Sequence, residues 1–227
     1  MGKMHHNLIC GLKGVYQDQY HLYMLEEYMQ FGELLNLLKK FKRLNTNLAR
    51  FYTAQVVEVF DYMHNKDLIY RDLKPENVLL QSNGYIKLTD FGFVKKLKKW
   101  GRTYTLCGTP EYMAPEVIMN AGHGQAADWY TLGIFIYELL CGLPPFMHND
   151  TYEIFQKTLK EKIKFPAGIS SDAKSLIKHL TKHDLSKRYG NLVDGTDTVR
   201  NHRFFSAIDF KNLVSMKKEA PYIPTLS

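Results

Sequence analysis

The sequence is poor in the residues that build disulfide-stapled or zinc-stapled folds. It has only three cysteines, Cys10, Cys107 and Cys141, and they form no C-x-x-C pair. An odd number of widely spaced cysteines argues against a disulfide framework and favours a reducing compartment. The first residues, MGKMHHN, also lack the apolar core of a secretory signal peptide. We therefore expect a cytoplasmic location, with the nucleus as a second compartment.

Long hydrophobic runs are equally scarce. The main apolar stretch, Trp129 to Leu143, contains Glu138 and is shorter than the roughly 18–20 residues that a membrane span needs. It is better explained as a helix that is apolar on all sides because it lies inside a domain. We expect no membrane partner.

Phosphate-binding glycine loops are missing before residue 72, since no G-x-G-x-x-G occurs there. One G-x-G-x-x-A run, Gly122 to Ala127, follows a helix-like segment instead of a strand, which argues against a dinucleotide-binding fold.

The net charge is +7, from 30 Lys and Arg against 23 Asp and Glu, and a basic run spans residues 95–102. No groove-reading motif accompanies that run, so we expect no nucleic-acid partner.

What is present is ordinary globular material, with 45% apolar and 23% charged residues over 227 positions. The spacing of apolar residues predicts a fold of the α+β class that is mainly α-helical. We expect strands at 8–10, 22–25, 68–70, 78–80 and 85–88, with turns around 17–19 and 82–84. We expect helices at 33–41, 46–64, 125–141, 150–160, 171–181 and 196–204, and an extended end marked by Pro221 and Pro224.

Four short motifs carry the functional signal. The loop YRDLKPEN, residues 70–77, follows the long helix, and DFG, residues 90–92, comes eighteen residues after Asp72. GTPEY, residues 108–112, and APE, residues 114–116, come next. Each alone could be a solvated turn, but their order and spacing together resemble the protein kinases. The residues of these motifs most resemble those of the AGC group of Ser/Thr kinases, and within that group those of the cAMP-dependent kinases.

The resemblance implies an enzyme that moves the γ-phosphate of ATP with Mg²⁺ as cofactor. It makes Asp72 the base, Lys74 the cation at the γ-phosphate and Thr109 the hydroxyl that bonds both. Asn77 and Asp90 become the metal ligands, because hard oxygen atoms suit Mg²⁺. The ATP-binding positions implied are Glu27, Met29, Leu79 and Thr89.

The resemblance also implies a switch and a substrate. Thr105 stands at the activation-loop phosphosite, with Arg71 and Lys95 as the cations that would bind its phosphate. Glu33, Glu76 and Glu138 would receive substrate arginines, and Leu106, Pro110 and Met113 would line the apolar pocket after the target residue. The implied partners are proteins with basic residues before Ser or Thr, and an inhibitory regulatory subunit. The alternative for Glu138 taken alone is half of a structural ion pair.

Two further contacts are implied as scaffold, Glu116 with Arg188 and Asp128 with the backbone of the catalytic loop.

The resemblance divides the chain into residues 1–29, a remnant of the small lobe, residues 30–208, the large lobe, and residues 209–227, the start of a C-terminal tail. The small-lobe lysine in Ala-x-Lys is absent from these residues. We therefore expect a kinase-like large lobe with a remnant β-hairpin, and little or no phosphotransfer by the 227 residues alone. The alternative is a pseudokinase that captures basic segments without catalysis.

Glu26 departs from the family pattern, which has an apolar residue behind the adenine. A buried carboxylate there needs a cation. A second departure, around Lys98 to Gly101, lengthens the activation loop and leaves its path open.

Overall fold

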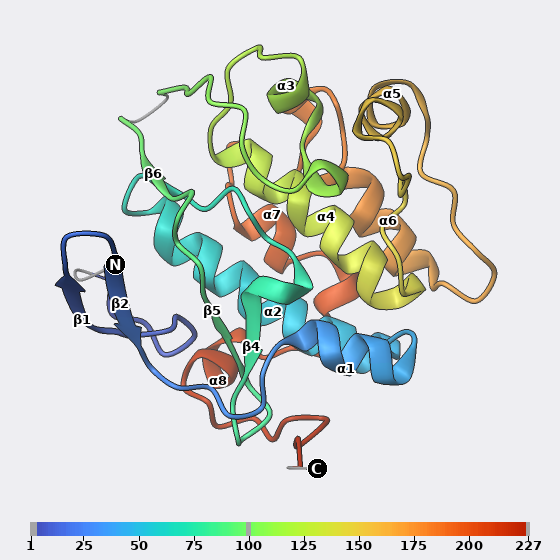
Figure 1. Cartoon of the computed structure of the whole chain (residues 1–227). Helices are drawn as coiled ribbons and strands as arrows, with labels where there is room; N and C mark the ends of the chain where they lie inside the picture. Colours follow the sequence, from blue (N-terminus) through green and yellow to red (C-terminus); the bar gives the residue numbers. More distant parts are fainter. Residues whose placement is uncertain (1–3, 99–100, 226–227) are drawn as a thin grey trace.

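The computed structural model describes residues 4–98 and 101–225, and in this part the chain forms a helical body with a projecting hairpin (Figure 1). The helices are α1 Leu34–Phe41, α2 Thr46–His64, α3 Pro115–Ile118, α4 Gln125–Cys141, α5 Thr151–Lys160, α6 Ser171–Leu180, α7 Asp197–Arg200 and α8 Phe210–Val214. Short 3-10 turns are η1 Pro75–Asn77, η2 Pro110–Tyr112, η3 Leu185–Lys187 and η4 Arg203–Phe205. The strands are β1 Leu12–Gln17, β2 Leu22–Glu26, β3 Leu68–Ile69, β4 Val78–Leu80, β5 Ile86–Leu88 and β6 Lys95–Lys96.

Helices α2 and α4 form the centre of the body. Asn45 caps α2 by accepting a hydrogen bond from the backbone N–H of Leu48 at 2.9 Å. Helix α4 is buried on nearly every side and ends at Gly142, which takes the left-handed conformation with φ +90°. The two helices pack edge-to-face through Phe60 and Trp129, with ring centroids 5.7 Å apart. The apolar run that could have suggested a membrane span is therefore the core helix.

Three antiparallel pairs of strands hold the loops on one side of this core, β1 with β2, β3 with β6 and β4 with β5. The hairpin β4–β5 and the turn at Gly84 rest on the C-terminal segment, where the Tyr85 hydroxyl donates to the carbonyl of Lys218 at 2.6 Å. No helix in residues 4–98 and 101–225 is long and apolar enough to cross a membrane.

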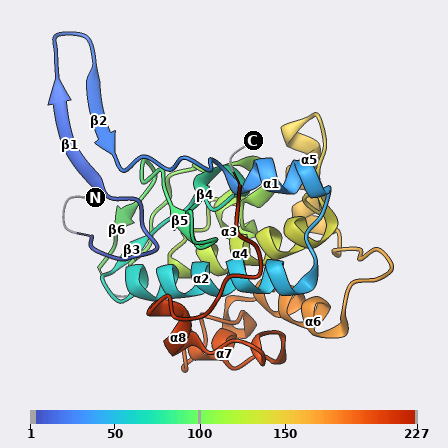
Figure 2. The same ribbon diagram turned by 90° about the horizontal axis from the view of Figure 1, so that it is seen from below.

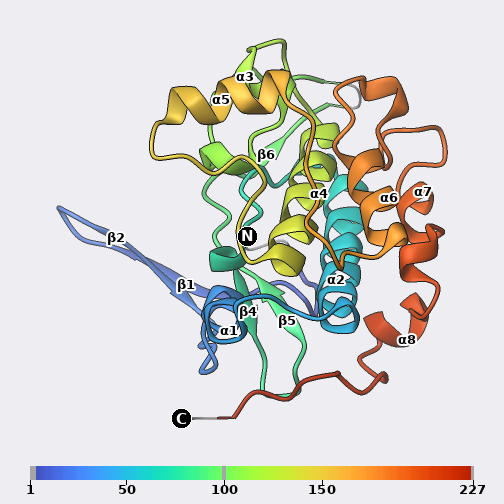
Figure 3. The same cartoon turned by 90° about the vertical axis from the view of Figure 1, so that its right-hand side faces the viewer.

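The hairpin β1–β2 extends away from the body, as Figures 2 and 3 show. Its apolar side chains are more than half exposed at Val15, Tyr16, Leu22, Tyr23, Met24 and Leu25. A two-stranded ribbon with both faces open has little packing to support it.

The prediction of a strand at Leu8–Cys10 is wrong. These residues are buried against the body, where Ile9 makes a single parallel bridge to Leu88, and the strand lies four residues later in β1. Leu88 donates a backbone hydrogen bond to Leu8 and accepts one from Cys10, both of 2.8 Å. These bonds hold the apolar run against the core. The connection between the strands accordingly falls at residues 18–21 instead of 17–19.

The predicted helix at 196–204 is also wrong in extent, because it is split into α7 and η4. His202 begins the second turn by accepting a hydrogen bond at Nδ1 from the backbone N–H of Phe204, at 3.1 Å. The other predicted helices agree with the structure to within two residues at each end, and α4 begins and ends at the predicted residues.

Candidate functional site

The Asp72 carboxylate is held by three side chains. Asp72 is 3% exposed, and its Oδ1 accepts a hydrogen bond of 2.9 Å from Thr109 Oγ1. Its Oδ2 lies 3.1 Å from Lys74 Nζ and accepts a hydrogen bond of 2.9 Å from Asn77 Nδ2. Lys74 Nζ also donates to Thr109 Oγ1 at 2.9 Å. The four side chains form one closed network, which fixes the direction of the carboxylate.

Asp90 is brought to the same side of the body. The residue before it, Thr89, donates its backbone N–H to the carbonyl of Asn77 at 3.0 Å and accepts at its own carbonyl from the Tyr70 hydroxyl at 2.6 Å. The pKa of Tyr70 is raised well above its usual value, first by burial and then by the carboxylates of Asp72 and Asp90. The charges of both carboxylates thus act on one buried hydroxyl. Asp90 is exposed and has a positive φ of 52°, a conformation that costs energy for a residue with a side chain.

Asn77 and Asp90 have the chemistry of a site for a hard divalent cation. The Asn77 amide uses Nδ2 for two hydrogen bonds to Asp72, so Oδ1 is the group left to bind a ligand. Asp90 uses Oδ1 for the backbone N–H of Gly92 at 3.1 Å, and its other oxygen has no hydrogen-bond partner among the described residues. One amide oxygen and one carboxylate fit Mg²⁺ that arrives with further oxygen ligands of its own.

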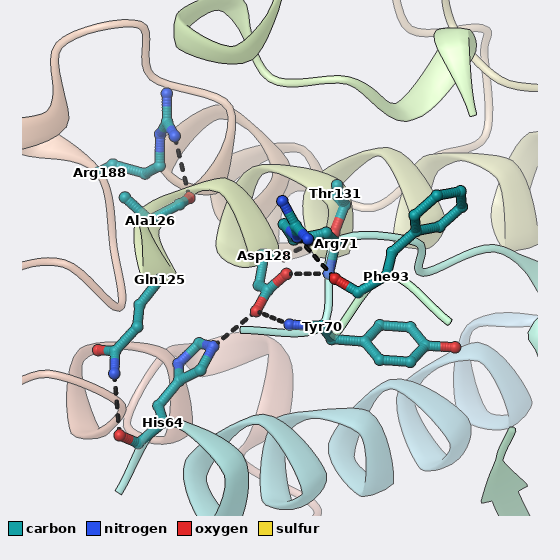
Figure 4. A network of polar contacts seen from close by, with 9 residues as sticks. All are labelled: His64, Tyr70, Arg71, Phe93, Gln125, Ala126, Asp128, Thr131 and Arg188. Atoms are coloured by element: carbon teal, nitrogen blue, oxygen red, sulfur yellow. Dashed lines mark hydrogen bonds and ion pairs between the residues drawn. The ribbon is translucent and has the colours of Figure 1, made fainter. Parts of the chain in front are cut away.

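A buried aspartate in α4 holds the catalytic loop from behind. Asp128 is fully buried and accepts hydrogen bonds from the backbone N–H groups of Tyr70 at 2.9 Å and Arg71 at 2.8 Å (Figure 4). His64 Nε2 lies 2.8 Å from the same carboxylate. Arg71 has a φ of +75°, and these bonds hold the strained residue in place next to Asp72. The expected tie between Asp128 and the loop backbone is present.

The activation-loop residues lie close together only in part. Thr105 is exposed, and its hydroxyl lies 3.4 Å from the hydroxyl of Thr103, which accepts a hydrogen bond of 2.9 Å from Lys95 Nζ. Arg71 instead donates from Nε to the carbonyl of Phe93 at 2.7 Å. The structure thus links Lys95 with Thr105 through Thr103 and gives Arg71 a different partner. Lys99 and Trp100 of the lengthened loop lie outside the described residues.

Two of the three predicted substrate carboxylates are linked electrostatically, because the charge of Glu76 acts on Glu138. Glu138 is 6% exposed, and its carboxylate accepts a hydrogen bond from the Tyr112 hydroxyl. Burial raises its pKa to about 7, against a lowering by Tyr112, and the charges of Glu76 and Glu111 raise it further. Glu76 has a buried oxygen with no partner among the described residues. Glu33 precedes α1 and pairs with Leu79 in an isolated antiparallel bridge, and none of the hydrogen bonds or ion pairs of the described residues joins it to the other two.

The expected apolar pocket is divided in the same way. Met113 is buried in a small cluster with Tyr112 and Val117, whereas Leu106 is more than half exposed. Pro110 begins η2, partly buried, between them in sequence.

The expected nucleotide positions lie where the hairpin joins the body. Glu27 donates its backbone N–H to the carbonyl of Gly11 at 2.9 Å, and its carboxylate pairs with Lys87 Nζ at 2.6 Å, which lowers its pKa. Met29 accepts at its carbonyl from the N–H of Gly32 at 3.1 Å, and Leu79 lies opposite Lys87 in the β4–β5 pair.

Glu26 has a different partner from the cation that the sequence suggested. Its carboxylate accepts a hydrogen bond of 3.0 Å from Thr89 Oγ1, and the residue is only half-buried. A hydroxyl and partial solvation satisfy this carboxylate in the described chain. Its charge and that of Glu27 add to burial in raising the pKa of the neighbouring Cys10 thiol.

Comparison with known proteins decides the family. The protein kinase domain matches residues 1–205. The chain belongs to the protein kinase family. It is 45% identical over 226 residues to a cAMP-dependent protein kinase catalytic subunit of Dictyostelium discoideum, which covers 100% of this chain and 35% of that protein.

Further relatives agree with this assignment to the kinases. The human cAMP-dependent protein kinase catalytic subunit PRKX is 45% identical over 222 residues, which cover 98% of this chain and 62% of PRKX. The cAMP-dependent protein kinase type 3 of Saccharomyces cerevisiae is 42% identical over 221 residues, 97% of this chain and 55% of that protein. The chain therefore spans between about a third and two thirds of the length of these kinases.

Sequence reasoning missed two histidines of this kinase lobe. His64 supports Asp128, which supports the catalytic loop, but the two residues are 64 positions apart in the chain. His123 is 3% exposed and exchanges two backbone hydrogen bonds of 2.9 Å with Thr103 in the activation loop. The G-x-G-x-x-A pattern around His123 was the only signal at that position, and it pointed to a different fold.

Proposed function

We propose that the chain is the catalytic lobe of a Ser/Thr protein kinase that transfers the ATP γ-phosphate to proteins. The observation that carries this proposal is the network of Asp72, Lys74, Asn77 and Thr109, together with the backbone hydrogen bond of 3.0 Å that joins Thr89, the residue before Asp90, to Asn77. Transfer of a phosphoryl group depends mainly on positioning and charge neutralisation, and this network does both.

Each residue has a defined task in the proposal. The substrate hydroxyl attacks the γ-phosphorus as the bond to the leaving ADP oxygen breaks, and Asp72 orients that hydroxyl and accepts its proton late. Lys74 places a positive charge against the transferred group. Thr109 is hydrogen-bonded to both Lys74 and Asp72 and so fixes the positions of the two side chains relative to each other. Mg²⁺, held by Asn77 and Asp90, would neutralise phosphate charge. Glu27 and Met29 would bind the adenine through their backbone, and Leu79 and Thr89 would line its pocket.

Substrate choice follows from the carboxylates. Glu76 and Glu138 would bind arginine side chains before the target residue, with Glu33 as a third acidic position. Leu106, Pro110 and Met113 would contact an apolar residue after it. The proposed substrate is therefore basic-basic-x-Ser/Thr-apolar. A phosphate on Thr105 would be bound by Lys95 and, after a change of partner, by Arg71.

A second candidate function is that the chain binds basic segments without catalysis, either as a decoy for substrates or as the partner of an inhibitory subunit. The raised pKa of Glu138 favours it, since a buried carboxylate whose charge is disfavoured by burial and by Glu76 is suited to a cationic partner. The names of the relatives, which specify catalytic subunits, suggest that a separate subunit could be such a partner.

Thermal unfolding of the 227-residue chain with two ligands tests both candidates. One ligand is Mg·ATP and the other is a peptide with two arginines, a spacer, alanine at the target position and an apolar residue after it. We expect a rise in melting temperature with the peptide that Glu76→Gln removes, and a smaller rise with Mg·ATP that Asp90→Asn removes. A response to the peptide alone supports the capture role. No response to either ligand contradicts both candidates.

A further inference from the structure

A small cavity lies beneath the loop that carries Thr109 and Met113. It has a volume of about 20 Å³, which is room for one water molecule. Its wall is formed by the catalytic loop, the 107–114 segment and the first turns of α4, and its polar lining includes Arg71, Thr109, His123 and Thr131. Arg71, Thr109 and Met113 of its lining have roles proposed above, but those roles do not say what occupies the cavity.

Two buried nitrogen atoms without partners belong to residues that line it. Arg71 Nη1 and His123 Nε2 have no hydrogen-bond partner among the described protein atoms. Buried polar groups are nearly always satisfied, and leaving one unpaired costs about 1–3 kcal/mol. The Thr131 hydroxyl donates to the carbonyl of Asp128 at 2.8 Å, so its oxygen still has lone pairs to offer as an acceptor.

With the proton of the neutral His123 imidazole on Nδ1, the two nitrogen atoms require a ligand that both accepts and donates hydrogen bonds. A guanidinium can only donate, whereas the unprotonated nitrogen of a neutral imidazole can only accept. A halide ion could serve Arg71 but could not donate to His123. A water molecule can accept from one and donate to the other.

His123 is buried among charged groups of both signs. It is faced by Arg71 from the catalytic loop, Lys95 from β6, Glu116 from α3 and Asp128 from α4. Glu116 is already bound by Arg188 through contacts of 2.6 and 3.0 Å, and Asp128 by the loop backbone. Burial first, and then the charge of Arg71, lowers the pKa of His123, which favours a neutral imidazole with one protonated nitrogen and one acceptor nitrogen.

We propose that this cavity is a binding site for one water molecule, which accepts a hydrogen bond from Arg71 Nη1 and donates one to His123 Nε2. Thr131 Oγ1 is placed as its third partner. Because His123 is joined to Thr103 by two backbone hydrogen bonds and Arg71 precedes Asp72, the water connects the catalytic loop to the activation loop. In this role His123 is a positioning residue.

The first test is a crystal structure of the 227-residue chain, grown at neutral pH with bromide in place of chloride. The proposal expects a peak without anomalous signal, within hydrogen-bond distance of both nitrogen atoms. A bromide peak would show an anion site and overturn the proposal, and so would an empty cavity.

The second test reads the tautomer of His123 in the unaltered chain, and a variant is needed only to assign the signal. Nitrogen-15 NMR of the imidazoles should show Nε2 of His123 without a proton and hydrogen-bonded at neutral pH. The His123→Gln variant assigns the signal because it alone removes it, and His5→Gln, at an exposed histidine, is the matched control. A proton on Nε2 at neutral pH would contradict the proposed direction of the hydrogen bond and overturn the proposal.

Discussion

Glu138 is a carboxylate in surroundings that disfavour its charge. Its pKa of about 7 is above the ordinary value of 4.5 because burial outweighs the hydrogen bond from Tyr112. A raised pKa in the folded state means that the group stabilises the fold below about pH 4.5 and that this contribution is lost as the pH rises through 7. A bound arginine would reverse the preference by stabilising the charged form.

We predict that binding of a basic peptide releases protons from Glu138. Calorimetry of the peptide in buffers of different ionisation enthalpy, at about pH 6, 7 and 8, should show proton release that declines toward pH 8. Glu138→Gln should remove most of this release and weaken binding by about 10–100-fold, as loss of a charged hydrogen-bond partner does. Glu153→Gln, at an exposed site in α5, is the control and should change neither. Binding enthalpies that do not depend on the buffer would contradict the prediction.

The same residue gives a stability prediction with a definite sign. At about pH 8, Glu138→Gln should raise the free energy of unfolding, by up to about 3 kcal/mol, because the neutral amide avoids the buried charge. The gain should shrink as the pH falls below 6, where the native carboxyl is also neutral. Urea unfolding at both pH values measures it, and a gain that grows at low pH would show that the assigned cause is wrong.

At this scale the sequence supports strong predictions where motifs carry chemistry. The expected contacts of Thr109 with Asp72 and Lys74, and of Glu116 with Arg188, are present in the structure. The catalytic roles of Asp72, Lys74 and Thr109 stay predictions. The supports behind them, His64 and His123, could not be predicted because their partners are set by the packing of distant helices and loops.

At the scale of elements, the hairpin β1–β2 stands apart from the rest. Its two strands pair with each other, and their apolar side chains have no core to cover them. The misplaced strand shows why: Leu8–Cys10 has the apolar character of a core strand and packs on the body, whereas β1 and β2 are exposed. Apolar content in a short segment predicts burial more securely than it predicts a strand.

We predict that this hairpin makes the chain self-associate. Leu22→Lys with Met24→Lys, on one face of β2, should lower the weight-average mass in sedimentation velocity at high protein concentration, because exposed apolar strands pair or stack. Met119→Lys with Leu143→Lys, at side chains equally exposed on the body, is the matched control and should have little effect. A chain that is monomeric throughout, or an equal response to both pairs, would contradict the prediction.

At the scale of the whole molecule, α4 connects two hydrophobic clusters. The larger one surrounds α2. The smaller one includes Tyr112 and Met113, from the segment that carries the proposed apolar substrate contacts. The mainly helical lobe and the order of its elements follow from apolar periodicity in the sequence. How residues 209–225 run beneath the β4–β5 hairpin does not, since the hydrogen bond from Tyr85 to Lys218 joins segments 133 residues apart.

The central claim is that Asp72 and its partners form a phosphotransfer site that needs a covering small lobe. We predict little or no phosphate transfer by these 227 residues alone, because water around an uncovered site would weaken its electrostatics. The most direct measurement joins this chain to the small-lobe segment of human PRKX and follows transfer of labelled phosphate from Mg·ATP to a basic serine peptide. We predict transfer by the chimera, and a loss of about 10²–10⁴-fold with Asp72→Asn. A folded chimera that binds Mg·ATP and the peptide but transfers nothing, or one whose activity survives Asp72→Asn, would contradict the claim.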